Sequence, residues 1–284
     1  MGVILLGNDP GIAEAAGKYG CCHIAELEKT EYGTPLLSDI FAKAQKACET
    51  PLICYSNADI LFPFELLTAV DLVAKRFKNF LITGQRWNMD VSSLITADNV
   101  KVLMQSRHQV GELYRPDGMD YFVFPCGMVT MPPFVIGRPA WDNWMVWDAL
   151  SKKIPIVDAS SYITIIHQNH DYAHVPEKVS QNWEDSPESV RNRALFRTFC
   201  PTVEHSSLFS VHGAPWRISE NGVLEQNTLK EHIAAKVSKR NKEFFDKSPF
   251  ASALRHCLKK LCNVKHYEIL RSIWHKLLLK TTGK

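Results

Sequence analysis

The hydrophobic residues of this chain form short runs in which successive positions, rather than alternate ones, are apolar. Examples are Val3-Ile-Leu-Leu6, Leu52-Ile-Cys-Tyr55 and Tyr121-Phe-Val-Phe124. A strand that is apolar on both faces is buried on both faces, which happens in sheets covered by helices on two sides. Between the runs, apolar residues recur at helical spacing, as they do over 36–44. The alternation predicts an α/β fold with a mainly parallel, Rossmann-like sheet between layers of helices.

The same patterns divide the chain into elements and regions. Residues 85–118 are polar, and we predict no helix or strand there. Beyond about residue 185 the periodicity is helical, with polar loops near 201–229. We therefore expect an α/β domain over 1–185 and a helical region over 186–284. The expected strands are 3–6, 51–56, 80–84, 121–125, 154–158 and 162–167, and the expected helices are 12–19, 36–44, 63–76 and 141–151.

The charge is distributed unevenly along the 284 residues. Residues 230–284 hold 14 Lys or Arg against 4 Asp or Glu, a net of +10, whereas 1–229 hold 19 against 26, a net of −7. No apolar run reaches the roughly 20 residues that cross a bilayer, and no basic segment precedes the apolar start. We expect neither a spanning helix nor a signal peptide. The eight cysteines form no ligand-type pairs, which favours free thiols in a reducing, cytoplasmic location.

The basic region ends in an amphipathic stretch, 267–280. Its apolar residues share one helical face, with basic residues at other positions. Such a helix binds an anionic membrane surface, at about 1 kcal/mol per basic residue, or packs its apolar stripe on the protein; the pattern leaves both open. Aromatic residues do not interleave with the basic ones, so we expect no nucleic-acid partner. The apolar face comprises Ile269, Leu270, Ile273, Trp274, Leu277 and Leu278.

The polar group most indicative of a site is Asn57-Ala-Asp59, directly after the run that ends at Tyr55-Ser. Open α/β sheets bind ligands beyond the carboxyl ends of their strands, where side chains converge. Asn and Asp also favour turns and helix N-caps through local hydrogen bonds. Position alone leaves both readings open.

Four further clusters combine acids, arginines, histidines and large aromatic rings. Sugars stack their C–H faces on such rings and donate hydroxyl hydrogen bonds to carboxylates, so the clusters indicate saccharide recognition. We expect Trp141, Trp144, Asn143 and Tyr121 to contact a saccharide acceptor. Packing of the rings in the core is the alternative for each. The clusters are Gly84-Gln-Arg86-Trp87, Asp120-Tyr-Phe-Val-Phe124, Ile136-Gly-Arg138-Pro-Ala-Trp141-Asp142-Asn143-Trp144 and Ile166-His167-Gln-Asn-His170-Asp-Tyr172.

Together, these motifs over roughly residues 1–180 resemble the nucleotide-sugar-dependent glycosyltransferases of the GT-A fold. Asn57-Ala-Asp59 is similar to their D-x-D element, whose acid holds a divalent metal, Mn²⁺ or Mg²⁺, on the nucleotide diphosphate. Asn57 stands in place of the first acid and adds no charge, so we expect weaker metal binding than with two carboxylates. The resemblance places His167 or His170 on the metal or diphosphate.

The resemblance also implies roles in transfer. Asp142 matches the acid that deprotonates the acceptor hydroxyl in inverting members, because inversion needs a base opposite the leaving nucleotide. Asp120 is the other candidate, as base or as a ligand for sugar hydroxyls. Arg86 and Arg138 are expected to neutralise the diphosphate, a role suited to guanidinium groups, with surface ion pairing as their alternative.

The resulting expectation is a sugar transferase, cytoplasmic or peripheral at the inner face of a membrane, that uses a nucleotide-diphosphate sugar and a saccharide or lipid-linked saccharide acceptor. Members of the superfamily usually have a strand ahead of the one similar to 3–7, so we expect either that this strand is supplied differently or that donor binding is weakened. A non-catalytic glycan- or partner-binding protein on the same fold is one alternative. A sugar nucleotidyltransferase is another, disfavoured because no Gly-rich loop with a lysine follows the first strand.

Overall fold

A computed structural model describes residues 2–96, 99–170, 185–201 and 205–227. Contacts group residues 1–199 and 205–227 into one compact unit, and 200–204 with 228–284 into a second. Nearly all described residues belong to the first unit, and the stretch 267–280 lies outside them. Across the described ranges, every helix is too short or too polar to cross a membrane.

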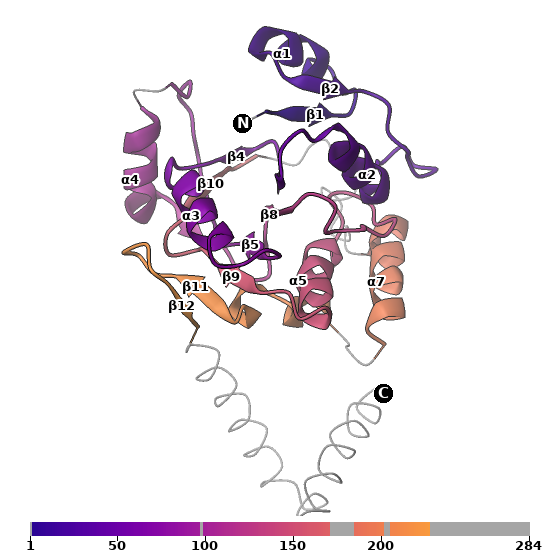
Figure 1. Cartoon of the computed structure of the whole chain (residues 1–284). Coiled ribbons are helices and arrows are strands. Elements are labelled where there is room, and N and C mark those ends of the chain that lie inside the picture. The colour runs from indigo at the N-terminus through magenta and orange to yellow at the C-terminus, as the bar shows by residue number, and fades with distance from the viewer. Residues whose placement is uncertain (1, 97–98, 171–184, 202–204, 228–284) are drawn as a thin grey trace, which may run out of the picture. The chain divides into compact units, whose positions relative to one another are not determined.

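The main sheet has six strands in the order β12-β11-β9-β5-β8-β3 (Figure 1). Strand β9 pairs in parallel with β5 and β11, whereas the three remaining pairs are antiparallel. The fold is therefore α/β, as predicted, but the sheet is mixed and not mainly parallel. Consecutive apolar residues report burial on both faces, not strand direction, and this is why the prediction of direction was wrong. The strands span Leu52–Ser56 (β3), Leu81–Thr83 (β5), Tyr121–Pro125 (β8), Ile156–Asp158 (β9), Trp216–Ile218 (β11) and Leu224–Gln226 (β12).

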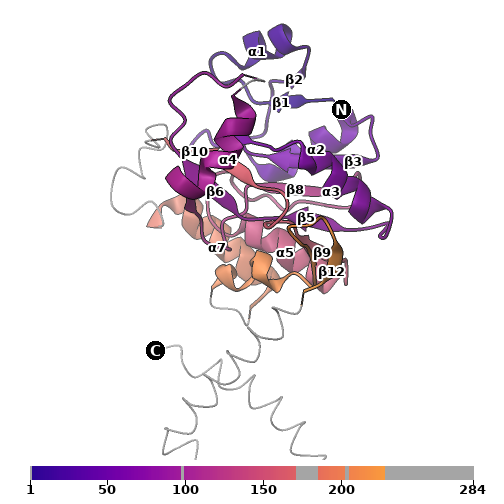
Figure 2. The same cartoon turned by 90° about the vertical axis from the view of Figure 1, so that its left-hand side faces the viewer.

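Two smaller sheets accompany it. One has the order β4-β10-β6-β7, with β10 parallel to β6 and antiparallel to β4. The other consists of β1 and β2, which pair in parallel and are connected through helix α1 beside them (Figure 2). The strands span Ile4–Leu6 (β1), Cys22–Ile24 (β2), Ile60–Leu61 (β4), Arg86–Met89 (β6), Glu112–Leu113 (β7) and Ile165–Gln168 (β10).

The helices lie beside these sheets, and α5 is buried over most of its circumference. Those predicted at 12–19 and 141–151 are confirmed with the same bounds. Residues 85–118, for which the sequence predicted no helix or strand, contain β6, α4 and β7. The helices span Ile12–Tyr19 (α1), Leu37–Ala47 (α2), Glu65–Ala74 (α3), Val100–Val110 (α4), Trp141–Ser151 (α5) and Pro187–Phe199 (α7), with short 3₁₀ turns at Ser206–Leu208 (η2) and Val211–Gly213 (η3).

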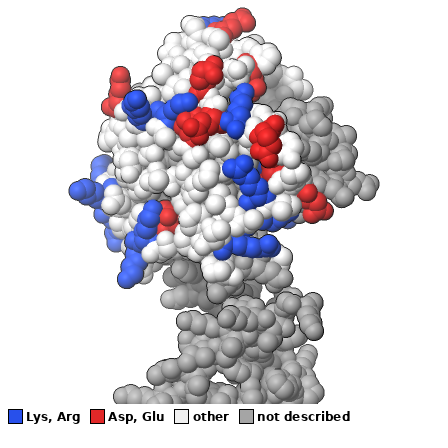
Figure 3. Space-filling view, turned by 90° about the vertical axis from the view of Figure 1, so that its right-hand side faces the viewer, with Lys and Arg blue, Asp and Glu red and all other residues white. Residues whose placement is uncertain are grey.

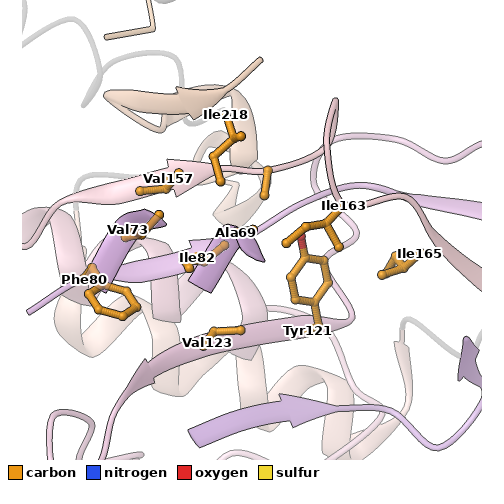
Figure 4. Close-up of a cluster of buried hydrophobic side chains, with 11 residues drawn as sticks. Ala69, Val73, Phe80, Ile82, Tyr121, Val123, Val157, Ile163, Ile165 and Ile218 are labelled. Atoms are coloured by element: carbon orange, nitrogen blue, oxygen red, sulfur yellow. The ribbon is translucent and has the colours of Figure 1, made fainter. Parts of the chain in front are cut away.

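Both faces of strand β8 are buried, as its sequence predicts. Tyr121 and Val123 join a cluster with side chains of α3 and of the neighbouring strands (Figure 4). On the other face, Phe122 packs against Trp141 of α5 and Phe124 stacks on Phe41 of α2. Each such side chain, fully buried, contributes roughly 1.5 to 3 kcal/mol to folding. The central strands are thereby fixed, and with them the loops at their ends.

The region beyond residue 185 is not wholly helical, which corrects the expectation from its periodicity. Strands β11 and β12 form a hairpin, and β11 extends the main sheet through β9. Three-residue strands contain too few positions to show a period of two, so the sequence carried no signal for them. The compact unit continues past residue 185 to Asn227 because of this hairpin and α7.

Charged side chains are interspersed on the face shown in Figure 3. Lysines and arginines there lie among aspartates and glutamates, with uncharged surface between them. The described part of that face therefore presents no extended field of one sign.

Candidate functional site

Strand pairing brings together three metal-binding side chains from distant parts of the sequence. Asp59 lies in the turn between β3 and β4, and the antiparallel register pairs Ile60 of β4 with His167 of β10. The backbone carbonyl of Asp59 accepts a hydrogen bond from Gln168 N–H at 3.0 Å, which holds the turn against β10. His170 follows two residues beyond the end of β10. The sequence left open which histidine approaches Asp59, and both do.

The three side chains converge on one point. Asp59 Oδ2 lies 3.2 Å from His167 Nε2 and 3.1 Å from His170 Nε2. The ligand atoms all lie within 4.8 Å of one another. Burial raises the pKa of Asp59, but hydrogen bonds with His167 and His170 and the charge of His167 outweigh this effect, and the pKa lies below its usual value. Asp59 therefore carries its charge throughout the neutral range.

The donor set fits a divalent transition metal. Two imidazole nitrogens and one carboxylate, on side chains that are buried or half-buried, form the arrangement that leaves coordination positions open for a ligand. Within the described residues, Asp59 Oδ1 and His167 Nδ1 are buried without a hydrogen-bond partner, and buried polar atoms are rarely left in this state. A cation held by Asp59 and the histidines would compensate the buried carboxylate.

A second acidic centre, around Asp120, is occupied by protein partners. Its Oδ1 accepts a hydrogen bond from the Asn57 amide at 2.8 Å, and its Oδ2 accepts one from Arg86 at 2.6 Å. The Arg86 guanidinium also stacks on the Tyr114 ring, 4.1 Å from its centroid, and donates to Asn88. Because Asn57 donates to Asp120, a carboxylate in its place would put two negative oxygens in contact. This contact gives a structural reason for an amide at this position.

Asp142 has an unusual environment for an acid. It lies in the first turn of α5, half-buried, and accepts the N–H of Asn143 at 2.9 Å. Burial raises its pKa to about 7, and the negative charges of Asp120 and Asp117 add to the effect. A group with this pKa takes up and releases a proton near neutral pH, as a general base must.

The residues expected to contact an acceptor lie in the interior. Trp144 is 2% exposed between Phe134 and Phe199, and Trp141 meets Tyr55 edge to face at 5.0 Å. Asn143 donates to the Phe209 carbonyl at 2.9 Å, and Tyr121 is fully buried in the main core. The rings of Trp141, Trp144 and Tyr121 thus correspond to the packing alternative, since they present almost no surface for stacking on a sugar, and the Asn143 amide bonds to the backbone.

Arg138 lies in a different network from the other predicted residues. It pairs with Glu188 of α7 at 2.7 Å, and both are buried. The Glu188 carboxylate also accepts hydrogen bonds from the hydroxyls of Thr30 and Thr34, at 2.5 and 3.0 Å. The expected alternative for arginine was a surface ion pair, whereas this pair is buried and joins three distant segments of the chain.

Sequence reasoning missed Tyr55 as a residue of the site. Its hydroxyl donates to Asn57 Oδ1 at 3.2 Å, and its ring packs between Phe41 and Trp141. Burial and the charges of Asp120, Asp142 and Asp59 raise the pKa of Tyr55. Tyr55 therefore lies within electrostatic reach of all three acids. The only signal in the sequence was its place near the end of a strand, two positions before Asn57.

Comparisons of the chain with models of protein families, with curated proteins and with solved structures find no match.

Proposed function

We propose that the chain is a metal-dependent glycosyltransferase of the GT-A type. It would transfer a sugar from a nucleotide-diphosphate donor to a saccharide or lipid-linked saccharide, with inversion at the anomeric carbon. The observation that carries the proposal is the convergence of Asp59, His167 and His170 at the end of the apolar strand β3. The resemblance of Asn57-Ala-Asp59 to the D-x-D element predicts Asp59 and one of the two histidines as ligands of such a metal.

The donor set favours Mn²⁺ over Mg²⁺. Mg²⁺ prefers oxygen ligands, whereas the transition metal Mn²⁺ also accepts imidazole nitrogen, and among the described residues Asp59 is the one carboxylate of the cluster. A bound cation would neutralise negative charge on the leaving diphosphate. Arg86 and Arg138 already pair with Asp120 and Glu188, so in this proposal the metal site, more than the arginines, compensates that charge.

Asp142 is the base in this proposal, and Asp120 is a positioning residue. Asp120 accepts a hydrogen bond from Asn57 at one carboxylate oxygen and from Arg86 at the other, so its carboxylate is already bound to protein partners. Asp142 is half-buried and has a pKa of about 7, so it can accept the proton of an attacking hydroxyl at neutral pH.

Thermal unfolding of the full chain tests the proposal. The samples contain MnCl₂ or MgCl₂, each alone or with UDP-, GDP-, CMP- or dTDP-sugars. A ligand at 100 times its Kd adds about 2.7 kcal/mol, which raises the Tm by about 5 to 10 °C in a protein of this size. We expect Mn²⁺ to raise the Tm by itself, and one nucleotide sugar to raise it further when Mn²⁺ is present.

Asp59→Ala should lose both shifts, and Asp71→Ala is the matched control because Asp71 is an exposed aspartate on α3. A nucleotide-sugar response that is unchanged in Asp59→Ala would contradict the metal role. A folded chain that responds to none of the nucleotide sugars would favour the non-catalytic alternative.

A further inference from the structure

The C-terminal half of helix α2 packs on the end of strand β8 (Figure 2). Phe41 of α2 stacks on Phe124 of β8, with ring centroids 5.9 Å apart. One turn later in the helix, the Gln45 side chain accepts a hydrogen bond from Gly127 N–H and donates one to Val129 O, both at 2.9 Å. Ring stacking and side-chain hydrogen bonds therefore hold the helix against the segment that follows β8.

The same packing directs two cysteines towards each other. Cys48 caps the C-terminus of α2, two turns after Phe41 and on the same helical face. Cys126 follows Phe124 by two positions, so its side chain leaves β8 on the same side as the Phe124 ring. The Cys126 thiol donates to Gln45 O at 3.6 Å, which confirms that it points to α2.

Both thiols lie where α2, β3 and β8 meet. The Cys48 thiol lies 3.1 Å from Thr50 O and 3.8 Å from Leu52 O, at the start of β3. Cys126 N–H donates at 2.9 Å to the carbonyl of Pro51, the residue between those two in the sequence. Burial raises the pKa of the Cys126 thiol, and the charge and hydrogen bond of Cys48 raise it further, so the two side chains interact directly.

We propose that Cys48 and Cys126 are a redox-active pair that a small-molecule disulfide oxidises to an intramolecular disulfide. Both thiols are free and half-buried, so a small oxidant reaches them. Two thiols that are held side by side by the surrounding structure need no large rearrangement to form the bond. The inference is independent of the proposed transferase activity.

The reaction is an ordinary thiol–disulfide exchange in two steps. One cysteine thiolate attacks a sulfur of the oxidant, the S–S bond of the oxidant breaks, and a mixed disulfide forms while one small thiol leaves. The second cysteine thiolate then attacks the protein sulfur of the mixed disulfide and displaces the second small thiol. Two electrons pass from the cysteines to the oxidant, and the two cysteine protons end on the released thiols.

The test adds oxidised glutathione to the reduced full chain and locates the link by mass spectrometry of a tryptic digest. Cys48 lies on the tryptic peptide 47–75 and Cys126 on the peptide 108–152. Cys54 shares the first peptide, so Cys54→Ser is the matched control and should form the link as the wild type does. Cys48→Ser and Cys126→Ser should not form it. The Tm of each reduced variant establishes that it is folded.

We expect the ratio of linked chain to glutathione mixed disulfide to be at least about tenfold higher in the folded chain than in urea, because the fold holds the two thiols together. The oxidised chain should unfold about 5 to 15 °C higher, since the link closes a long loop, and dithiothreitol should reverse the change.

Mixed disulfides at Cys48 and Cys126 without a link between them would overturn the proposal. An equal ratio in urea would also overturn it, as would a link that joins other cysteines of the folded chain equally often.

Discussion

Asp142 makes the stability of the protein depend on pH in a direction unusual for an aspartate. Its pKa is about 7 in the folded protein, against about 3.9 in an unfolded chain. Between these values the folded state binds more protons, so the free energy of unfolding falls as pH rises and levels off above about 7. Asp142→Asn should therefore be more stable than the wild type at pH 8, and the difference should shrink by up to about 1.4 kcal/mol per pH unit towards pH 4. Urea unfolding of both proteins at pH 5, 6, 7 and 8 measures this difference in the free energy of unfolding.

The control for this prediction is Asp71→Asn, because the side chain of Asp71 is exposed. A difference between Asp142→Asn and the wild type that is constant with pH would show that the pKa of Asp142 is ordinary.

Asp142→Asn also tests the proposed role of Asp142 as the general base. The rate of sugar transfer should fall by about two to four decades, while the Mn²⁺-dependent Tm shift remains. Near-normal transfer would remove Asp142 from the mechanism.

At the scale of elements, α7 is held to the sheet domain by the buried carboxylate of Glu188. This carboxylate accepts bonds from Arg138, Thr30 and Thr34. Removing one member of a buried pair leaves the other charge unpaired, which costs about 3 to 5 kcal/mol. Glu188→Leu should therefore lower the free energy of unfolding by about that amount, and the double variant with Arg138→Met should recover much of it. Urea unfolding checks both values.

The Arg217–Glu225 pair of the β11–β12 hairpin provides the comparison. Its atoms lie 2.7 Å apart, as close as those of the buried pair, but both side chains are about a third exposed or more. Glu225→Leu should cost no more than about 1 kcal/mol, because water screens exposed pairs. Equal costs for the two glutamates would show that α7 does not depend on the buried pair.

The elements also show which features a sequence reveals. Helix α5 and strand β8 were predictable because their residues carry a local pattern of burial. The pattern did not separate a tryptophan that packs in the core from one that stacks on a sugar, because both are large and apolar, and Trp144 proved to be the former. Arg138 and Glu188 are 50 positions apart, and no local signal links them. The approach of both histidines to Asp59 required the register of β10 against β4.

For the molecule as a whole, the question is how much of the chain is needed to fold the sheet domain. Strand β11 covers the edge of β9, and α7 contributes Glu188, Ser189 and Asn192, which are buried. A chain that ends at residue 185 loses all of these contacts and exposes apolar surface on α5, so it should not fold cooperatively.

A chain that ends at Asn227 keeps every contact within the first compact unit. It should unfold in a single transition, because those contacts form one compact unit. Calorimetry of both shortened chains, with and without MnCl₂, measures this directly. A folded, Mn²⁺-responsive chain ending at 185 would show that the hairpin and α7 are additions to a domain that is already complete. The opposite outcome is that the chain ending at residue 185 does not fold, while the chain ending at residue 227 folds and keeps its Mn²⁺ response. Residues 186–227 would then be part of the structure that holds Asp59 and its histidines in place.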